Sequence, residues 1–321
     1  MNAPSPSPSR ASLLLAFAAV YFIWGSTYLA IRVAIESLPG FLMAGARFCA
    51  AGAILYAYGR LRGGRAPERR HWGPAIVIGA ALLLVGNGVV VWVEHRIPSS
   101  LAALLVATEP LWIVLLDWAR PNGVRPARVE LIGVVIGFTG VALLIGPVEG
   151  GGAADLLSAG ALVVSTFAWA LGSLYARGAA MPESAPVATG MKMMSGGALL
   201  LLAGTVTGEW GRFDPAAVTA RSVIAFFYLM VFGSLIAFSA YVFLLRVTTV
   251  ARASTYAFVN PVVAVSLGAL LGGEAVTWRT AAATVVIVGA VALITTARLG
   301  AGREPKGDGR AAAPPLEAEG E

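Results

Sequence analysis

The chain has 321 residues, of which 58% are hydrophobic and only 12% are charged, and its mean hydropathy is +0.78. A soluble domain carries about 25% charged residues, so this composition excludes an ordinary soluble protein and predicts an integral membrane protein. The formal net charge of +6 fits basic loops held against a negatively charged membrane surface, so we expect no nucleic-acid partner.

The chain begins with a short polar segment, residues 1–10, that is predicted to be a disordered tail. The apolar run that follows continues without a small-residue cleavage site, so it is interpreted as a retained helix and not as a signal peptide. A membrane-crossing helix needs about 20 apolar residues. Ten such helices are predicted, at residues 11–35, 40–60, 72–93, 99–119, 128–146, 155–177, 184–206, 221–245, 250–272 and 277–297. Residues 300–321 are predicted to be a disordered C-terminal tail.

Basic residues are distributed unevenly between the connecting segments. With the N-terminus inside, the cytoplasmic segments hold fifteen Lys and Arg residues and the outer loops hold four. The positive-inside rule then places both termini in the cytoplasm. We expect a multi-pass protein of the plasma or inner membrane.

The two halves of the chain look like divergent copies of one unit. Residues 45–59 align without gaps to residues 190–204, at a constant offset of 145 that pairs Arg47 with Lys192. The offset also pairs Trp24 with Trp169. Because each half has five predicted helices, the second copy enters the membrane from the opposite side, which makes the repeats inverted. The predicted domains are a first repeat at 11–146 and a second repeat at 155–297.

Several motifs occur in an order that is familiar from one family. WGSTYLAIR (24–32), IPSSLAALLVATEP (97–110), TYAFVNPVVAV (255–265) and LGGE (271–274) resemble the drug/metabolite transporter superfamily and, within it, the YedA-like exporters of the EamA family. The resemblance covers about Phe17 to Thr296. It implies ten helices in two EamA-type repeats, cytoplasmic termini, and export of small metabolites or toxic compounds.

The chain departs from the family pattern at its acidic residues. Glu274 follows LLGG in the second repeat, whereas the nearest acid in the first repeat is Asp117. Glu109, in TEP, is an acidic residue at a position where a neutral residue would be expected. Glu109 is a candidate proton-coupling carboxylate; the alternative is a structural salt bridge with Arg47 or another buried cation.

Two intramembrane cations lead the predicted site. Arg47 lies about 12 Å of helix from the outer face, and Lys192 lies at a similar depth from the inner face. Charges at such depth usually face the protein interior, although snorkelling to the headgroups is the alternative. Cations here suit an anionic or zwitterionic substrate group. The predicted substrate-binding residues are Trp24, Ser26, Tyr28, Arg47, Asn87, Trp92, Trp169, Lys192, Tyr256 and Asn260.

Other residues are interpreted structurally. Pro110 and Pro261 are predicted to kink their helices at equivalent places. Arg32 is either a gate or a snorkelling cation. Glu94 and His95, at the outer end of the third helix, are interpreted as solvated residues, and a pH-sensing or gating role is the alternative. A single cysteine and two histidines leave little for a metal, haem or disulfide, so no metal and no cofactor are expected.

These patterns predict a secondary transporter. Its expected activity is export of amino acids, related metabolites or drugs by alternating access, with a small-molecule substrate, the lipid bilayer and a proton as candidate partners. An importer or an uncoupled facilitator of the same fold is the first alternative. An intramembrane enzyme is the second, although HExxH and GxSxG motifs are absent. Monomer and homodimer both stay open.

Overall fold

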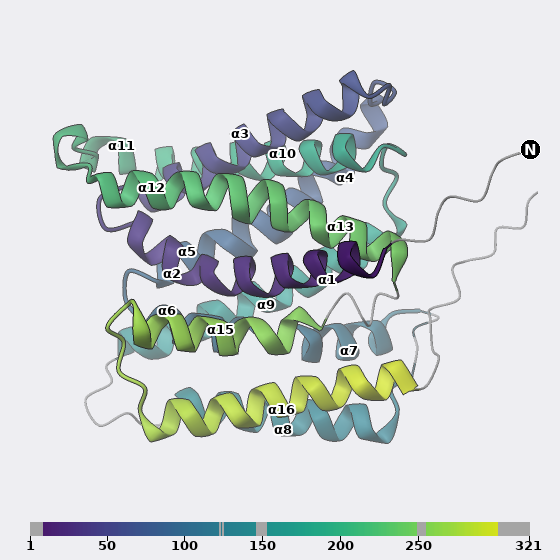
Figure 1. The fold of residues 1–321 in the computed structure, drawn as a ribbon, viewed down its shortest axis with the longest axis vertical. Coiled ribbons are helices and arrows are strands. Elements are labelled where there is room, and N and C mark those ends of the chain that lie inside the picture. The colour runs from purple at the N-terminus through teal and green to yellow at the C-terminus, as the bar shows by residue number, and fades with distance from the viewer. Residues whose placement is uncertain (1–8, 122, 124, 146–152, 249–254, 301–321) are drawn as a thin grey trace, which may run out of the picture.

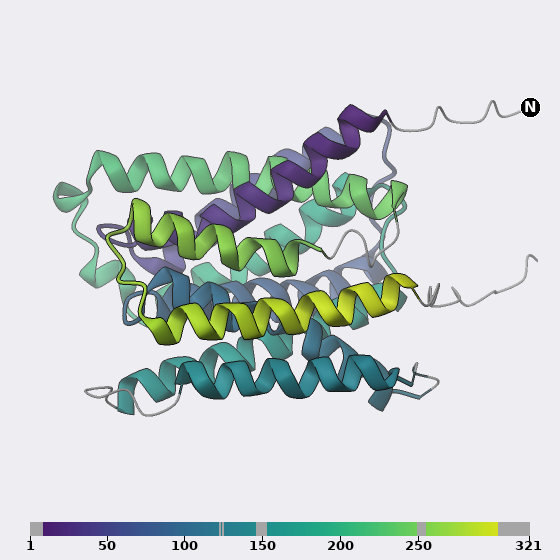
Figure 2. The ribbon, with the colours of Figure 1, turned by 60° about the horizontal axis from the view of Figure 1, so that its bottom comes forward.

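The computed structural model describes residues 9–121, 123, 125–145, 153–248 and 255–300. The described residues form helices and turns and contain no strand. The helices run roughly side by side in layers, as Figures 1 and 2 show from two directions. The predicted all-α class is therefore confirmed.

The helices of the first half follow the predicted spans closely, because apolar length and Pro/Gly breaks determine both. They are α1 (Arg10–Ala18), η1 (Ala19–Ile23), α2 (Trp24–Ala34), α3 (Gly40–Leu61), α4 (Arg69–Gly79), η2 (Ala80–Asn87), α5 (Gly88–Val93), α6 (Ser99–Val106), α7 (Glu109–Ala119) and α8 (Arg128–Ile145).

The second half repeats this arrangement, with α3 and α10 each 22 residues long. Its helices are α9 (Ala153–Gly178), α10 (Ala185–Val206), α11 (Glu209–Arg212), η3 (Pro215–Ala217), α12 (Ala220–Tyr228), η4 (Leu229–Ile236), α13 (Ala237–Val247), α15 (Tyr256–Leu270) and α16 (Trp278–Gly300).

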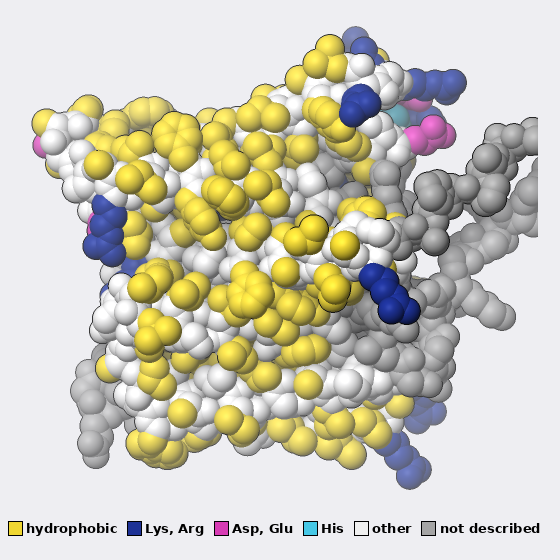
Figure 3. All heavy atoms as spheres, viewed as in Figure 1, with side chains coloured by type: hydrophobic (Ala, Val, Ile, Leu, Met, Phe, Trp, Pro, Cys, Tyr) yellow, Lys and Arg dark blue, Asp and Glu magenta, His cyan; other side chains and the backbone are white. Residues whose placement is uncertain are grey.

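Among the residues that the structure describes, eight helical runs are long and apolar enough to cross a membrane, and α15 is apolar but shorter. The predicted start of the ninth span at residue 250 lies outside the described residues, as do residues 1–8 and 301–321 of the predicted tails. Arg10, placed in the tail by the prediction, is already helical. Figure 3 shows one broad face covered largely by hydrophobic side chains, with Lys and Arg at its edges, as a lipid-facing surface requires.

Helices α3 and α10 pack antiparallel through glycines. A Cβ added to Gly45 would lie 2.9 Å from the Gly197 carbonyl oxygen, and one added to Gly52 would lie 2.9 Å from the Gly190 carbonyl oxygen. Small residues let membrane helices approach this closely. The contact brings the second predicted span of each half together.

Three helical runs contain a turn of π-helix, namely η1, η2 and η4. Such turns leave backbone groups displaced from the regular ladder and occur often at functional sites. η2 and η4 are both eight residues long and lie in the third and eighth predicted spans. Apolar runs such as AALLLVGN gave no sign of them in the sequence.

The two prolines act differently. The fourth span is interrupted at Ala107 and Thr108, and α7 restarts at Glu109 with Pro110 in its first turn, where proline needs no hydrogen-bond partner. α15 continues through Pro261. The predicted kink at Pro110 is thus a break between two helices, whereas the described helix around Pro261 is unbroken.

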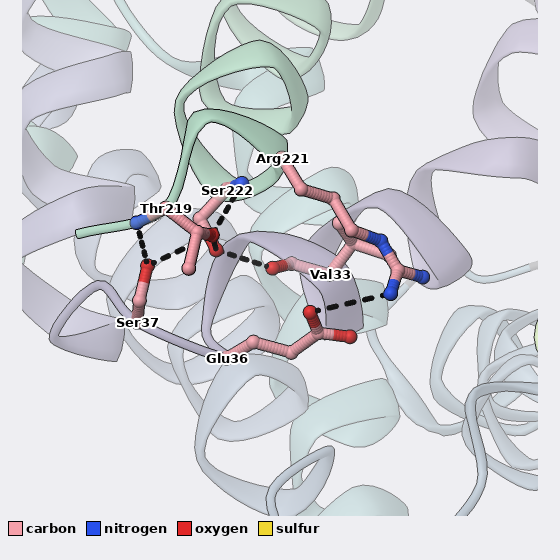
Figure 4. A network of polar contacts seen from close by, with 6 residues as sticks. All are labelled: Val33, Glu36, Ser37, Thr219, Arg221 and Ser222. Carbon is pink, nitrogen blue, oxygen red and sulfur yellow. Dashed lines mark hydrogen bonds and ion pairs between the residues drawn. The ribbon is translucent and has the colours of Figure 1, made fainter. Parts of the chain in front are cut away.

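The bundle has two polar ends. We call the end that carries α11 the α11 end, and the end where α1 begins and α16 finishes the α1 end (Figure 1). At the α11 end, the Ser222 hydroxyl donates to the Val33 carbonyl at 2.8 Å and the Thr219 amide donates to Ser37 Oγ at 3.1 Å (Figure 4). These bonds tie the end of α2 to the start of α12.

Candidate functional site

A cavity of about 180 Å³ lies in the middle of the bundle, between helices from both halves of the chain. Its walls come from α2, α3, α4, η2, α5, α6, α7, α9, α10, η4, α13 and α15, so its assembly requires both halves of the chain. Eight of the ten predicted substrate-binding residues line it, together with Glu109: Trp24, Tyr28, Arg47, Asn87, Trp169, Lys192, Tyr256 and Asn260.

The other two predicted residues lie elsewhere. Ser26 donates to the Ile23 carbonyl at 2.7 Å and is 2.6 Å from the Tyr228 hydroxyl, so its side chain joins two helices. Trp92 lines a separate hollow of about 800 Å³ at the α11 end, which we call the vestibule. There the Arg96 guanidinium lies 4.1 Å from the centre of the Trp92 ring. Neither residue lines the central cavity, unlike the other eight predicted residues.

Arg47 is held at one side of the cavity with only part of its donor capacity used. Its Nη2 donates to Asn87 Oδ1 at 3.0 Å, and its guanidinium lies 4.2 Å from the centre of the Phe48 ring. The residue is 3% exposed, and Nε has no hydrogen-bond partner. A buried guanidinium with an unused N–H group can donate a hydrogen bond to a carboxylate or phosphate oxygen.

Lys192 lines the same cavity from α10. No ion pair to its ammonium group is found among the described residues. An unpaired ammonium group away from water is unfavourable, and such residues in membrane proteins mark substrate or ion pathways. Two cations from different halves of the chain therefore meet at one space.

Glu109 is the carboxylate of the cavity. It begins α7, where the helix N-terminus favours negative charge, and the Tyr256 hydroxyl donates a hydrogen bond to it. Within the described chain it forms no ion pair with Arg47 or with any other cation. The alternative of a structural salt bridge is therefore not found in this conformation.

The rings of Trp24 and Tyr256 form an aromatic part of the cavity wall. Trp24 Nε1 donates to the Gly233 carbonyl in η4 at 3.1 Å, and the Trp24 ring lies 5.2 Å from Tyr241 and 5.1 Å from Tyr256, centre to centre. The Tyr241 and Tyr256 hydroxyls are also hydrogen-bonded. Rings in these tilted and edge-to-face positions make a rigid surface.

The π-helical turn η2 shapes the remaining wall. Its Gly86 carbonyl accepts a hydrogen bond from the Ser165 hydroxyl at 2.7 Å. A Cβ on Gly86 would lie 2.6 Å from the Trp169 ring, so only glycine lets that ring rest against the backbone. Asn260 adds an unpartnered Oδ1 atom from α15. The sequence indicated these residues, but not the backbone turn that arranges them.

A second charged group lies at the α11 end. Glu274 Oε1 is 3.0 Å from Arg32 Nη1 and accepts from the Ser99 amide and hydroxyl at 2.8 and 2.7 Å, while Oε2 accepts from the Ser100 amide at 3.0 Å. Arg32 is thus an ion-pair partner of Glu274. Burial alone would raise the pKa of Glu274, but hydrogen bonds from Ser100 and Ser99 hold it below its usual value. The carboxylate also caps α6.

Glu94 is buried, whereas a solvated residue was predicted. It follows the last residue of α5, is 3% exposed, and neither carboxylate oxygen has a hydrogen-bond partner of good geometry in the described chain. Burial raises its pKa well above the usual value, Glu274 raises it further, and the charges of Arg32 and Arg47, with the Arg32 backbone, act against this rise. His95, by contrast, is exposed and lines the vestibule.

The described residues contain no group of three or more His, Cys, Asp and Glu side chains that could hold a metal ion. The arrangement of the cavity is instead that of a binding site: two cations, one carboxylate, amide and hydroxyl groups, and aromatic walls. It has room for a small molecule.

The sequence matches the family model for the EamA-like transporter family twice, at residues 11–146 and at residues 156–296. The chain belongs to the EamA-like transporter family. The expected family resemblance is therefore confirmed.

Among relatives of this family member is the uncharacterized inner membrane transporter YedA of Escherichia coli strain K12, 40% identical over 280 residues, or 86% of this chain and 88% of that protein. Protein PecM of Dickeya dadantii is 26% identical, covering 77% of this chain and 80% of that protein. One crystal structure, titled only "Crystal structure of protein", superposes on this chain with a TM-score of 0.63 and 23% sequence identity. The superposition covers 92% of this chain and 100% of that chain. The solved structure supports the fold alone.

Proposed function

We propose that this family member is a secondary transporter that exports a small anionic or zwitterionic metabolite by alternating access. The observation that carries the proposal is the meeting of Arg47 and Lys192, from equivalent positions of the two halves, at one central cavity. The inner membrane, named for the YedA relative, is the proposed location. Ten spans in two inverted repeats are the proposed architecture.

The α3–α10 contact supports inverted repeats. At the repeat offset of 145 residues, Gly45 corresponds to Gly190 and Gly52 corresponds to Gly197. The contact between Gly45 and Gly197 is thereby exchanged with the contact between Gly190 and Gly52, both of which are present. A pair of antiparallel helices with exchangeable contacts is what a two-fold axis in the membrane plane produces.

Orientation is part of the proposal. The fifteen-to-four division of Lys and Arg favours a cytoplasmic α1 end and an outer α11 end. The described chain starts and finishes at the α1 end, so both termini would be cytoplasmic (Figure 1). A tag or enzyme reporter fused to either terminus should therefore report the cytoplasm.

The dimensions of the cavity favour a metabolite over a larger drug. Its 180 Å³ corresponds to about six waters, each of which takes about 30 Å³ of liquid, and is below the range of about 300–1,000 Å³ of drug-sized sites. Two cations against the single carboxylate Glu109 favour an anionic group on the substrate. The aromatic wall around Trp24 suits an apolar portion. An amino acid or a related carboxylate fits this description.

Glu109 is the proposed coupling residue. It lies on the cavity wall and accepts a hydrogen bond from Tyr256. It forms no ion pair with a cation of the described chain. A carboxylate in such a place can bind a proton in one conformation and release it in another. The proposed export would then exchange an incoming proton for an outgoing substrate. An uncoupled facilitator or an importer would use the same cavity.

The first experiment is untargeted profiling of the medium of cells that express wild type, Arg47→Met, Lys192→Met, the double variant or an empty vector. Arg212→Met, an exposed cation at the α11 end, is the matched control. A compound enriched by wild type and the control, but reduced at least tenfold in both cavity variants at equal membrane abundance, would support the proposal. Equal export by the double variant would contradict the cation assignment.

Coupling needs a separate measurement. Glu109→Gln should abolish the response of export to an imposed pH gradient while substrate exchange at zero gradient continues. An unchanged response in that variant would remove Glu109 from the mechanism. Accumulation of the compound inside wild-type cells, and not outside, would turn the proposal toward import.

A further inference from the structure

Glu94 is a buried carboxylate that the proposed transport cycle does not yet use. Both of its oxygens lack good hydrogen-bond partners in the described chain, although the residue is 3% exposed. A buried polar group in this condition is costly when charged, so it needs either a proton or a cation. Its surroundings determine which of the two is available.

The charged and titratable groups that face Glu94 come from three elements. Tyr28 and Arg32 belong to α2, Arg47 belongs to α3, and Glu274 follows α15. Arg32 is already bound to Glu274 at 3.0 Å. Arg47 is therefore the one cation of this set whose charge is not engaged by a carboxylate in the described chain.

Arg47 and Glu94 interact electrostatically, and the present partner of Arg47 lies on the helical run that leads to Glu94. Asn87, its present hydrogen-bond partner, lies seven residues before Glu94 along the same helical run. Residues seven apart share one face of a helix and are separated by about 10 Å along its axis. The guanidinium thus lies against a face that carries an amide at the cavity and a carboxylate nearer the α11 end, and its Nε is still unpartnered.

Glu94 directly precedes two residues that line the vestibule. The next two residues, His95 and Arg96, are exposed and line the vestibule at the α11 end. The carboxylate is therefore sequestered by packing, but only one residue from a hollow that faces the surface. A change of conformation at this end could expose it to solution.

We propose that Glu94 is a proton-binding positioning residue that controls Arg47. With its proton bound, Glu94 leaves Arg47 on Asn87, facing the cavity and a substrate anion. With the proton lost, the carboxylate attracts the guanidinium away from Asn87 and toward the α11 end. The inference rests on the proposed transport function for its consequence, since Arg47 is the residue through which Glu94 would act on substrate.

The test uses the unfolding of purified full-length protein in detergent and needs no substrate. Unfolding midpoints are measured at pH 5 and pH 8 for wild type, Glu94→Gln, Arg47→Gln and the double variant. Glu36→Gln, an exposed acid at the same end, is the control. If Arg47→Gln does not fold, Arg47→Met, which also removes the positive charge, takes its place.

The expected sign follows from the raised pKa of Glu94. Below the unfolded pKa both states bind the proton. As pH rises toward the folded pKa, the unfolded state loses the proton first, and wild type loses stability. Glu94→Gln cannot lose it, so its midpoint relative to wild type should rise between pH 5 and pH 8 by about 2 °C or more. Removing Arg47 should enlarge this rise, because the ionised carboxylate then has no cation to attract.

Two results would overturn the proposal. If Glu94→Gln lowers the midpoint more at pH 8 than at pH 5, Glu94 is a permanently ionised partner in an ion pair. If the difference does not change with pH, or is the same with and without Arg47, Glu94 does not exchange a proton under the influence of that residue. Neither result depends on export, so a failure of the transport proposal in metabolite profiling would be distinguishable.

Discussion

Replacing Glu274 by Gln tests whether the α11 end is closed by one buried carboxylate. The Glu274 side chain is 3% exposed and forms an ion pair with Arg32. Its carboxylate also accepts three hydrogen bonds, from the Ser99 amide, the Ser99 hydroxyl and the Ser100 amide. A glutamine can present one oxygen to these donors and turns an NH₂ group toward the others. About two donors therefore lose their acceptor, at about 1–3 kcal/mol each.

The expected loss of stability is about 2–6 kcal/mol, which lowers the unfolding midpoint by about 5–15 °C. The measurement is a thermal scan of tryptophan fluorescence on purified protein at pH 7. Because the pKa of Glu274 is held below its usual value, the stabilisation is present above the unfolded pKa of about 4.3 and is lost as pH falls through the folded pKa. The gap between wild type and variant should therefore close below about pH 4.

Glu36→Gln is the matched control, since Glu36 also pairs with an arginine at the α11 end. Its carboxylate lies 3.6 Å from Arg221 in an exposed pair (Figure 4), and such pairs contribute at most about 1 kcal/mol. The reasoning fails if Glu274→Gln lies within 2 °C or so of wild type, or if the two variants lose equal stability. Either result would mean that the donors around Glu274 find other partners.

Three further substitutions probe the packing of the cavity and its support. Gly52→Ala should lower the unfolding midpoint by several degrees, because its Cβ would lie 2.8–2.9 Å from the α10 backbone, whereas Gly160→Ala, with nothing within 4 Å, should be neutral or stabilising. Trp24→Phe keeps a ring but loses the hydrogen bond to η4, and should cost about 1 kcal/mol in the same scan. Gly86→Ala should displace the Trp169 ring and reduce export at unchanged membrane abundance; unchanged export would show that this wall is not part of the site.

Much of the fold could be predicted because membrane helices are determined by length and apolarity. The predicted helix at 40–60 is α3 at Gly40–Leu61, and the prediction at 184–206 is α10 at Ala185–Val206. The meeting of Arg47 and Lys192 could also be anticipated, since the repeat offset and the high cost of a lipid-facing charge both point inward. These inferences use long-range patterns that survive divergence.

Details of side-chain direction were partly available and were missed. Trp24 and Tyr28 are four residues apart and share a helix face, whereas Ser26 lies about 200° away from Trp24 at 100° per residue. Ser26 accordingly contacts Tyr228 and not the cavity. The π-helical turn η2 is different, because no local residue pattern separates it from an α-helix of the same apolar composition.

Glu94 shows how the same periodicity can correct a reading based on depth alone. Its position just past the end of the third span indicated a solvated residue, since charges at span ends usually reach water. Seven residues from Asn87, however, it lies on the face that looks toward Arg47, and packing of α2 and the Glu274 segment covers that face. A helix end is solvated only where no neighbour covers it. In this bundle, the Glu94 side chain at the end of the third span is covered, so an acid near a membrane boundary can be a candidate for function.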